Sequence, residues 1–339
     1  MVLGAGLEPA CLSAYAPQTY VSAIPPPERE CAKRTKFAVE VAPSQVGSGK
    51  LLLVIVLLLV LDLGGFSITS TSMSTSMSTS MSTSTTAEEW IKVDLHIHTL
   101  EDPKDVLDYS AHQLLERAKA LGFGVLAITL HDAVFDRADV FADAASMGIL
   151  LVPAAEVRLR GSDVIVLNVT AEELAELTDF DDLRRLRARR GKSIFTIAPH
   201  PFYVLGASIG EKIVDLIDCF DAIELCHFHK GILNPNRRAM EVAARFGKPL
   251  IATSDAHQLH AFGRHYTSIP RPAALTVENV FTTLRRGPLR LTSPPASIVD
   301  LVSAFYFIFV AHPYRVRRQG RSALVGQAED ASLESKTQT

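Results

Sequence analysis

The chain has 339 residues, of which 47% are hydrophobic and 21% charged, and its formal net charge is −3. This balance is typical of a globular chain with a sizeable core, and the small net charge gives no electrostatic case for a general nucleic-acid binder. The four cysteines form no CxxC pair, so we expect no disulfide framework and a reducing, cytoplasmic compartment.

Residues 1–89 differ from the rest of the chain in composition and in hydrophobic pattern. An apolar run over residues 51–61 is short for a membrane span, and a Ser/Thr/Met repeat follows it. The opening GAGLEPACLSAYAPQTYVSAIPPP resembles bacterial reading frames translated across the antisense strand of a transfer-RNA gene. We therefore expect translation to start at Met73, Met77 or Met81, with residues 1–89 outside the folded domain. The alternative is a membrane tether through residues 51–66.

From Trp90 onward, strand patterns alternate with helix patterns. Alternation of this kind predicts βα units and a mainly parallel sheet, and six or seven units favour a closed or nearly closed barrel over an open sheet. The segment 163–169 is a candidate antiparallel strand, and Thr170 and Glu173 have the spacing of a helix capping box. The expected strands are 91–98, 124–130, 150–157, 163–169, 193–200, 221–227 and 248–257. The expected helices are 109–122, 136–149, 170–177, 179–192, 209–220, 234–247 and 276–287.

Histidines and acids gather where the predicted strands end. The carboxyl ends of parallel barrel strands form one rim, which is where active sites are built. A single HxH pair or a single glutamate after a strand is compatible with a solvated surface, but convergence on one rim is what a multinuclear metal site needs. The residues concerned are His96, His98, His131, Asp132, Glu156, His200, Glu224, His227, His229, Asp255 and His257.

Five ordered motifs, DLHIHT, AITLHD, VPAAEV, APHPF and TSDAH, resemble those of the PHP (polymerase and histidinol phosphatase) family of metal-dependent phosphoesterases. The resemblance covers Ile91 to Arg290. It implies an α/β fold, a distorted (β/α)7 TIM-like barrel, and two or three divalent ions (Mn, Zn or Fe) at the rim. We expect this PHP domain to span residues 90–292, followed by an apolar helix and a disordered tail over 293–339.

The family's metal ligands fall on particular residues of this chain. Glu156 is expected to bridge two ions, and the acid after the first motif is assigned to Asp102, with Glu101 and Asp105 as alternatives. The implied ligands are His96, His98, Asp102, His131, Glu156, His200, Asp255 and His257.

The chain departs from the family pattern at three places. Leu130 stands where many members have aspartate, and Ala155 replaces a glycine. No histidine of residues 161–169 matches the one that histidinol-phosphatase-like members carry there. The second metal is then expected to rely on Glu224, His227 or water.

The resemblance implies hydrolysis of a small phosphate monoester or nucleotide by metal-activated hydroxide. His257 or His229 is a candidate proton donor to the leaving group, and Lys230 and Arg264 are candidate phosphate contacts. One alternative is a 5′ exonuclease on short oligonucleotides, which the basic run at 184–192 would serve. Another is a metal-binding module without turnover. The apolar segment 298–311 is predicted to cover the barrel or to contact a membrane surface.

Overall fold

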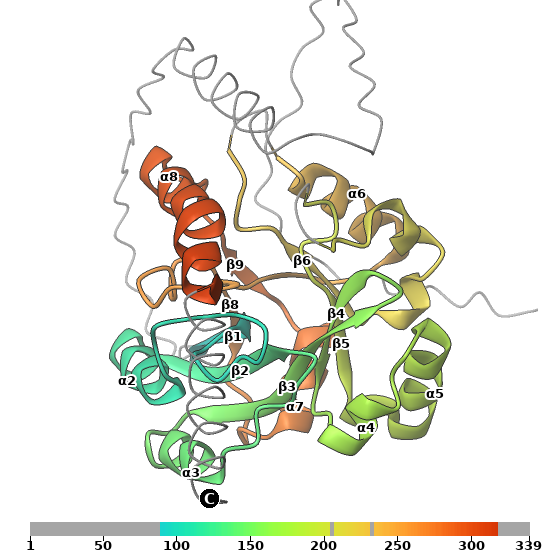
Figure 1. The fold of residues 1–339 in the computed structure, drawn as a ribbon. Coiled ribbons are helices and arrows are strands. Elements are labelled where there is room, and N and C mark those ends of the chain that lie inside the picture. Colours follow the sequence, from blue (N-terminus) through green and yellow to red (C-terminus); the bar gives the residue numbers. More distant parts are fainter. Residues whose placement is uncertain (1–88, 204–206, 231–233, 318–339) are drawn as a thin grey trace, which may run out of the picture. The chain divides into compact units, whose positions relative to one another are not determined.

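The structure, a computed structural model, describes residues 89–203, 207–230 and 234–317 (Figure 1). The predicted start site, the tether alternative and the tail beyond residue 317 lie outside these ranges. No helix within them is long and apolar enough to cross a membrane. The described cysteines, Cys219 and Cys226, are buried and unpaired with each other.

The strands of the described residues form one mixed sheet in the order β7-β6-β5-β4-β3-β2-β1-β8-β9. β1, β2 and β3 are mutually parallel, β4 is antiparallel to both its neighbours as its sequence predicted, and β5, β6 and β7 are again parallel. They are β1 (Trp90–Ile97), β2 (Phe123–His131), β3 (Leu150–Leu159), β4 (Ser162–Leu167), β5 (Phe195–Ala198), β6 (Ala222–Leu225), β7 (Leu250–Ala252), β8 (Tyr266–Pro270) and β9 (Arg290–Thr292).

The sheet curls until its two halves meet. An isolated parallel bridge joins Ile97, at the end of β1, to Ala256, just beyond β7. Thr267 of β8 also accepts a hydrogen bond from the Ala252 N–H and donates one to the Ala252 carbonyl oxygen, both at 2.9 Å. The result is the nearly closed barrel of a distorted TIM-like fold that the motifs predicted.

Helices flank the sheet, with α2 and α3 on one side and α4 and α5 on the other (Figure 1). Their ends follow local signals: Ser110 and Gln113 form a capping box at the start of α2, and Gly122 ends that helix at φ 73°. The predicted Thr170–Glu173 capping box is also present. They are α2 (Ala111–Leu121), α3 (Ala138–Ser146), α4 (Ala171–Ala175), α5 (Phe180–Arg190), α6 (Asn236–Phe246), α7 (Val277–Arg286) and α8 (Ile298–Tyr306).

One expected helix is wrong. The segment predicted as a helix over 209–220 forms two short 3-10 turns, Gly210–Val214 and Ile217–Cys219. Leu216 between them leaves the helical region, at φ −111° and ψ 13°. Tertiary packing decides here, since Ile213, Cys219 and Phe220 are buried in the cluster under α5 and α6.

The barrel interior is apolar beneath the rim. Val93, Val152, Ile165 and Phe195 belong to one buried cluster that also contains Phe281 of α7. Arg285 of the same helix donates to the Lys192 and Ile194 carbonyl oxygens just before β5. α7 therefore covers the end where β5 begins and leaves the carboxyl ends of the strands for the site.

Candidate metal centre

Four donor atoms converge where β1, β3 and β7 end. The His96 Nε2 and His98 Nε2 atoms lie 3.1 Å apart, and each is 3.4 Å from Glu156 Oε2. Asp255 Oδ1 is 3.3 Å from the His96 nitrogen and 3.5 Å from the His98 nitrogen. A tetrahedral ion with bonds of about 2.0–2.1 Å places its donors roughly 3.3 Å apart. The spacing of these side chains therefore fits the shell of one divalent metal ion.

Buried carboxylates hold both histidines of this group from behind. Glu224 Oε2 lies 3.0 Å from His96 Nδ1, and Asp102 Oδ2 lies 3.2 Å from His98 Nδ1. Such pairs fix the ring orientation of a ligating histidine and leave its Nε2 for the ion. The structure thus places Glu224 Oε2 behind His96.

The backbone around Asp255 is tied to β1. The Asp255 N–H donates to the His96 carbonyl oxygen at 2.9 Å, and Asp255 itself has φ 45°. His200 is also in the left-handed region, at φ 28°. Non-glycine residues are held there at a cost and cluster at functional sites. Asp94, which the sequence analysis did not single out, supports this loop because its buried carboxylate accepts from the Ser254 N–H at 3.1 Å.

A second group of donors lies on the other side of Glu156. His131 Nε2 is 3.3 Å from Glu156 Oε2, and the His98 ring has its centroid 4.4 Å from both the His131 and the His257 rings. His98, His131 and His257 form a group in which one ligand atom from each lies within 4.8 Å of the others. His257 Nε2 is 2.9 Å from Asp105 Oδ2.

The three candidate acids after the first motif occupy distinct places. Both carboxylate oxygens of Asp102 already have hydrogen-bond partners. Its Oδ1 accepts from two backbone N–H groups of the following turn. Its Oδ2 accepts from the His131 N–H and lies 2.9 Å from the His131 ring nitrogen Nδ1. Glu101 turns away, accepting from the Ala111 N–H at 3.3 Å. Asp105 is the acid beside His257. Asp102 therefore contacts the rings of His98 and His131, and Asp105 contacts the ring of His257.

A third group contains a residue that sequence reasoning missed. Glu156, Asp163 and His200 can bring one ligand atom each within 4.8 Å of one another. Asp163 pairs with Arg158 in the β3–β4 register and is ion-paired to it at 2.8 Å. The signal was an aspartate near the start of β4, in the segment 161–169 where histidinol-phosphatase-like members carry a histidine.

The departure at Leu130 does not reach the donors. The β2 strand alternates, so His131 faces the centre while Leu130 points outward into the cluster under α2 and α3, where it is 4% exposed. Thr129 bonds to the backbone of Ile97 at 3.2 Å. Leucine at position 130 therefore fills a packing position and does not displace any of the proposed metal ligands.

One family model and several known proteins match parts of this chain. Residues 234–289 match the family model PHP_C, described as PHP-associated. Over this segment the chain is similar to the PHP family. An uncharacterized protein of Methanocaldococcus jannaschii is 26% identical over 156 residues, 42% of this chain and 87% of that protein.

Solved structures with a similar fold have low sequence identity. A two-domain protein of Bacteroides vulgatus containing a predicted PHP-like metal-dependent phosphoesterase is 18% identical with a TM-score of 0.47, over 60% of this chain and 64% of that one. PsfC of Pseudomonas syringae is 19% identical with a TM-score of 0.48, over 67% and 98% of the two chains. The lesion-specific endonuclease Q of Pyrococcus furiosus is 15% identical with a TM-score of 0.44, over 64% and 66%. The chain thus spans less than two thirds of the Bacteroides and Pyrococcus proteins.

The charges of the candidate centre call for cations. Burial lowers the pKa of His96, but the Asp255, Glu224 and Glu156 carboxylates outweigh it and hold the pKa well above its usual range. The same balance raises the pKa of His200 to about 9. In return, the histidines hold the pKa of Glu156 and Asp255 well below their usual range despite burial. A divalent ion would take the place of these protons.

The predicted catalytic and phosphate-binding residues are only partly brought together. His257 joins the centre, but His229 directs its Nε2 to the Ser293 carbonyl oxygen at 3.1 Å and packs against the segment before α8. Arg264 is ion-paired with Asp300 of α8, and Lys230 is not among the residues that line the cavity beside the centre. The structure therefore places His257 in the centre, while the roles expected for His229, Lys230 and Arg264 stay predictions.

Proposed function

We propose that this PHP protein is a metal-dependent phosphoesterase acting on a small phosphate monoester. The observation that carries the proposal is the set of four converging donors on His96, His98, Glu156 and Asp255, spaced as one ion requires. Glu156 also offers Oε1 to His200, at 3.7 Å, while its Oε2 serves the histidines. One carboxylate shared in this way supports a centre with more than one ion.

The chain's own residues have separate tasks in this proposal. Bound divalent ions would supply an activated hydroxide and stabilise charge on the phosphoryl oxygens. Asp102 and Glu224 orient the imidazoles, and Asp163 and Asp105 complete the flanking groups. In a dinuclear centre His257, beside Asp105, holds a proton near the leaving-group oxygen; in a trinuclear centre it is a ligand. The number of bound ions therefore decides the role of His257.

The nuclease alternative would use the basic run at 184–192. The arginines of this run are already paired with acidic residues of the fold. Each arginine of α5 has an acidic partner within the described fold, and exposed charges paired in this way leave little net attraction for phosphate backbones. The pairs are Arg184 with Asp218, Arg185 with Asp182, Arg187 with Asp221, Arg189 with Glu176 and Arg190 with Glu173. This favours a small substrate over an oligonucleotide.

The test is metal analysis of the purified protein followed by a phosphate-ester panel with added Mn or Zn. We expect two or three ions per chain and turnover of small monoesters that changes little between low and moderate salt. Dominant activity on oligonucleotides that falls steeply with salt would favour the exonuclease. Bound metal with no turnover on the whole panel would favour the non-catalytic module.

A further inference from the structure

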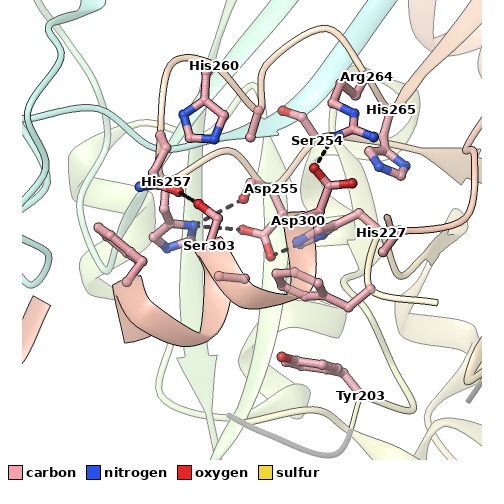
Figure 2. A pocket seen from close by; sticks show the side chains of 16 residues that line it. Tyr203, His227, Ser254, Asp255, His257, His260, Arg264, His265, Asp300 and Ser303 are labelled. Atoms are coloured by element: carbon pink, nitrogen blue, oxygen red, sulfur yellow. Dashed lines mark hydrogen bonds and ion pairs between the residues drawn. The ribbon is translucent and has the colours of Figure 1, made fainter. Parts of the chain in front are cut away.

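A cavity of about 220 Å³ opens beside the metal centre. Figure 2 shows Asp255 and His257 close to Asp300 and Ser303 of α8, and all four line the cavity. His227 also lines it, with Nδ1 3.8 Å from Asp255 Oδ2. The cavity therefore begins at a proposed metal ligand and is closed by the C-terminal helix.

We propose that this cavity binds the organic part of the substrate and that it takes an uncharged, ring-sized, largely apolar group, such as a phenyl or indolyl group. This inference rests on the proposed function, because it places the phosphoryl group at the ions and the leaving group in the cavity. It also makes the C-terminal helix part of the site.

The walls suit a ring. Phe228, Ala261, Ala304 and Phe307 line the cavity, and the Tyr203 ring stacks on that of Phe228 with centroids 5.7 Å apart and planes 21° apart. A cavity of roughly 150 Å³ with apolar walls admits a benzene ring. Stacking and apolar burial would therefore favour a flat group of one or two rings.

The arginine that lines this cavity already has an acidic partner. Arg264 is paired with Asp300, so the guanidinium is not free to meet a second phosphate. His265 Nδ1 lies 3.1 Å from Ser293 Oγ, so this ring also has a polar partner. An anionic leaving group would lose hydration in this cavity without a free guanidinium to pair with, whereas a neutral ring loses little.

The helical wall is fixed at both ends. Asp300, in the first turn of α8, is held by Arg264 of the loop between β7 and β8. Beyond the π-helical turn Phe307–Ala311, His312 Nε2 lies 3.2 Å from Asp105 Oδ1, and Arg315 Nη2 donates to Asp108 Oδ2 at 2.8 Å. Both acids belong to the loop after β1. The segment thus bridges two rim loops and holds the cavity's shape.

Phosphonates test the proposal on the metal-loaded full chain. Calorimetry compares phenylphosphonate with methylphosphonate, which share the metal-binding group and differ in the ring. We expect the phenyl compound to bind at least about tenfold more tightly, from the buried area of the ring. Ala304→Phe, which fills the cavity, should abolish that preference and leave methylphosphonate binding unchanged. Val302→Phe, on the same helix at a position 56% exposed, should keep it.

Several outcomes separate this inference from the proposed function. Equal binding of the two phosphonates by the wild type, or a preference that survives in Ala304→Phe, overturns the inference and leaves the phosphoesterase proposal standing. If phenylphosphonate binds more tightly but no ester is hydrolysed, the inference stands and the phosphoesterase proposal is overturned. Ala261→Phe fills the cavity from the other wall and replaces Ala304→Phe if that variant fails to fold.

Indole, which has no phosphoryl group, probes the cavity alone. Indole binding by the wild type that Ala304→Phe or Ala261→Phe removes supports the cavity even if both phosphonates fail to bind. Failure of indole and of both phosphonates overturns the inference and the proposed function together.

Discussion

Glu156 is the residue on which the three donor groups depend. It is 3% exposed, its Oε2 faces His96, His98 and His131, and its Oε1 faces His200. A buried carboxylate with so many imidazole neighbours is stable only with positive charge around it. Protons supply that charge in the metal-free protein, and ions would supply it in the loaded one.

Asp255 provides the clearest test of the first group of donors. Replacing Asp255 with alanine removes one of four donors, and because loss of an orienting partner alone costs about 10–100-fold in metal affinity, loss of a ligand should cost more. We expect less bound metal by elemental analysis and no measurable turnover, with the barrel still folded by circular dichroism. Asp136→Ala, in an exposed loop, is the matched control and should behave as wild type. Unchanged turnover in Asp255→Ala would refute the proposed site.

His200 gives a prediction for pH. Its folded pKa is raised to about 9 from an ordinary value of 6.5, so it stabilises the metal-free fold fully below about pH 6.5, and this contribution is lost as pH rises through 9. The melting temperature of the metal-free protein should therefore fall over that interval. The melting temperature of the metal-loaded protein should fall less over the same interval, because the ion replaces the proton. Melts with and without a chelator measure this, and parallel curves would contradict it.

The sequence predicted which residues belong to the candidate site better than it predicted the role of each. The ordered motifs located His96, His98, Glu156, His200 and Asp255, because a metal site needs those side chain types at strand ends. The sequence did not distinguish Asp102 from Asp105. The turn between them decides which carboxylate accepts hydrogen bonds from backbone N–H groups. It also could not show that Asp163 faces Glu156, since that depends on the register of the β3–β4 hairpin.

At the scale of elements, β2 shows how one strand serves two environments. His131 reaches the centre, while Leu130 packs under α2 and α3. Leu130→Ala should lower the free energy of unfolding by about 3 kcal/mol through the cavity it leaves. Metal content should not change, because the donors lie on the other face. Chemical denaturation with metal analysis tests both statements, and a loss of bound metal without a loss of stability would contradict this account of β2.

Asp221 joins elements at the opposite end of the barrel. It accepts from Arg187 of α5 at 2.6 Å, from Arg285 of α7 at 3.1 Å and from the Thr196 N–H of β5 at 2.9 Å. Asp221→Ala leaves two arginines without their partner and should cost roughly 3 kcal/mol of stability.

Asp218→Ala is the control for Asp221, because its pair with Arg184 is exposed and should contribute less than about 1 kcal/mol. Denaturation of both variants makes the comparison. Equal losses would show that burial does not distinguish these pairs.

At the scale of the whole chain, the alternation of strands and helices predicted the barrel because βα units can bury their strands in few ways. The part played by the C-terminal segment was less predictable. Its sequence is compatible with covering the barrel or with meeting a membrane, and the contacts of Asp300, His312 and Arg315 that place it at the rim are long-range. We therefore propose that the functional unit extends the 90–292 domain to include the helical segment up to residue 317.

The first residues of this unit allow the proposed domain start to be tested. β1 begins pairing with β8 at Trp90, opposite Pro270, and the Glu89 carbonyl oxygen accepts from the Arg271 N–H at 2.7 Å. Because these bonds and the candidate site are made by residues from Glu89 onward, we expect a chain beginning at Met81 to keep the melting temperature and metal content of the full chain. Thermal melts and elemental analysis of the two chains, prepared side by side, measure this. A large drop in melting temperature in the shorter chain would show that residues 1–80 stabilise the barrel and that the proposed boundary is misplaced.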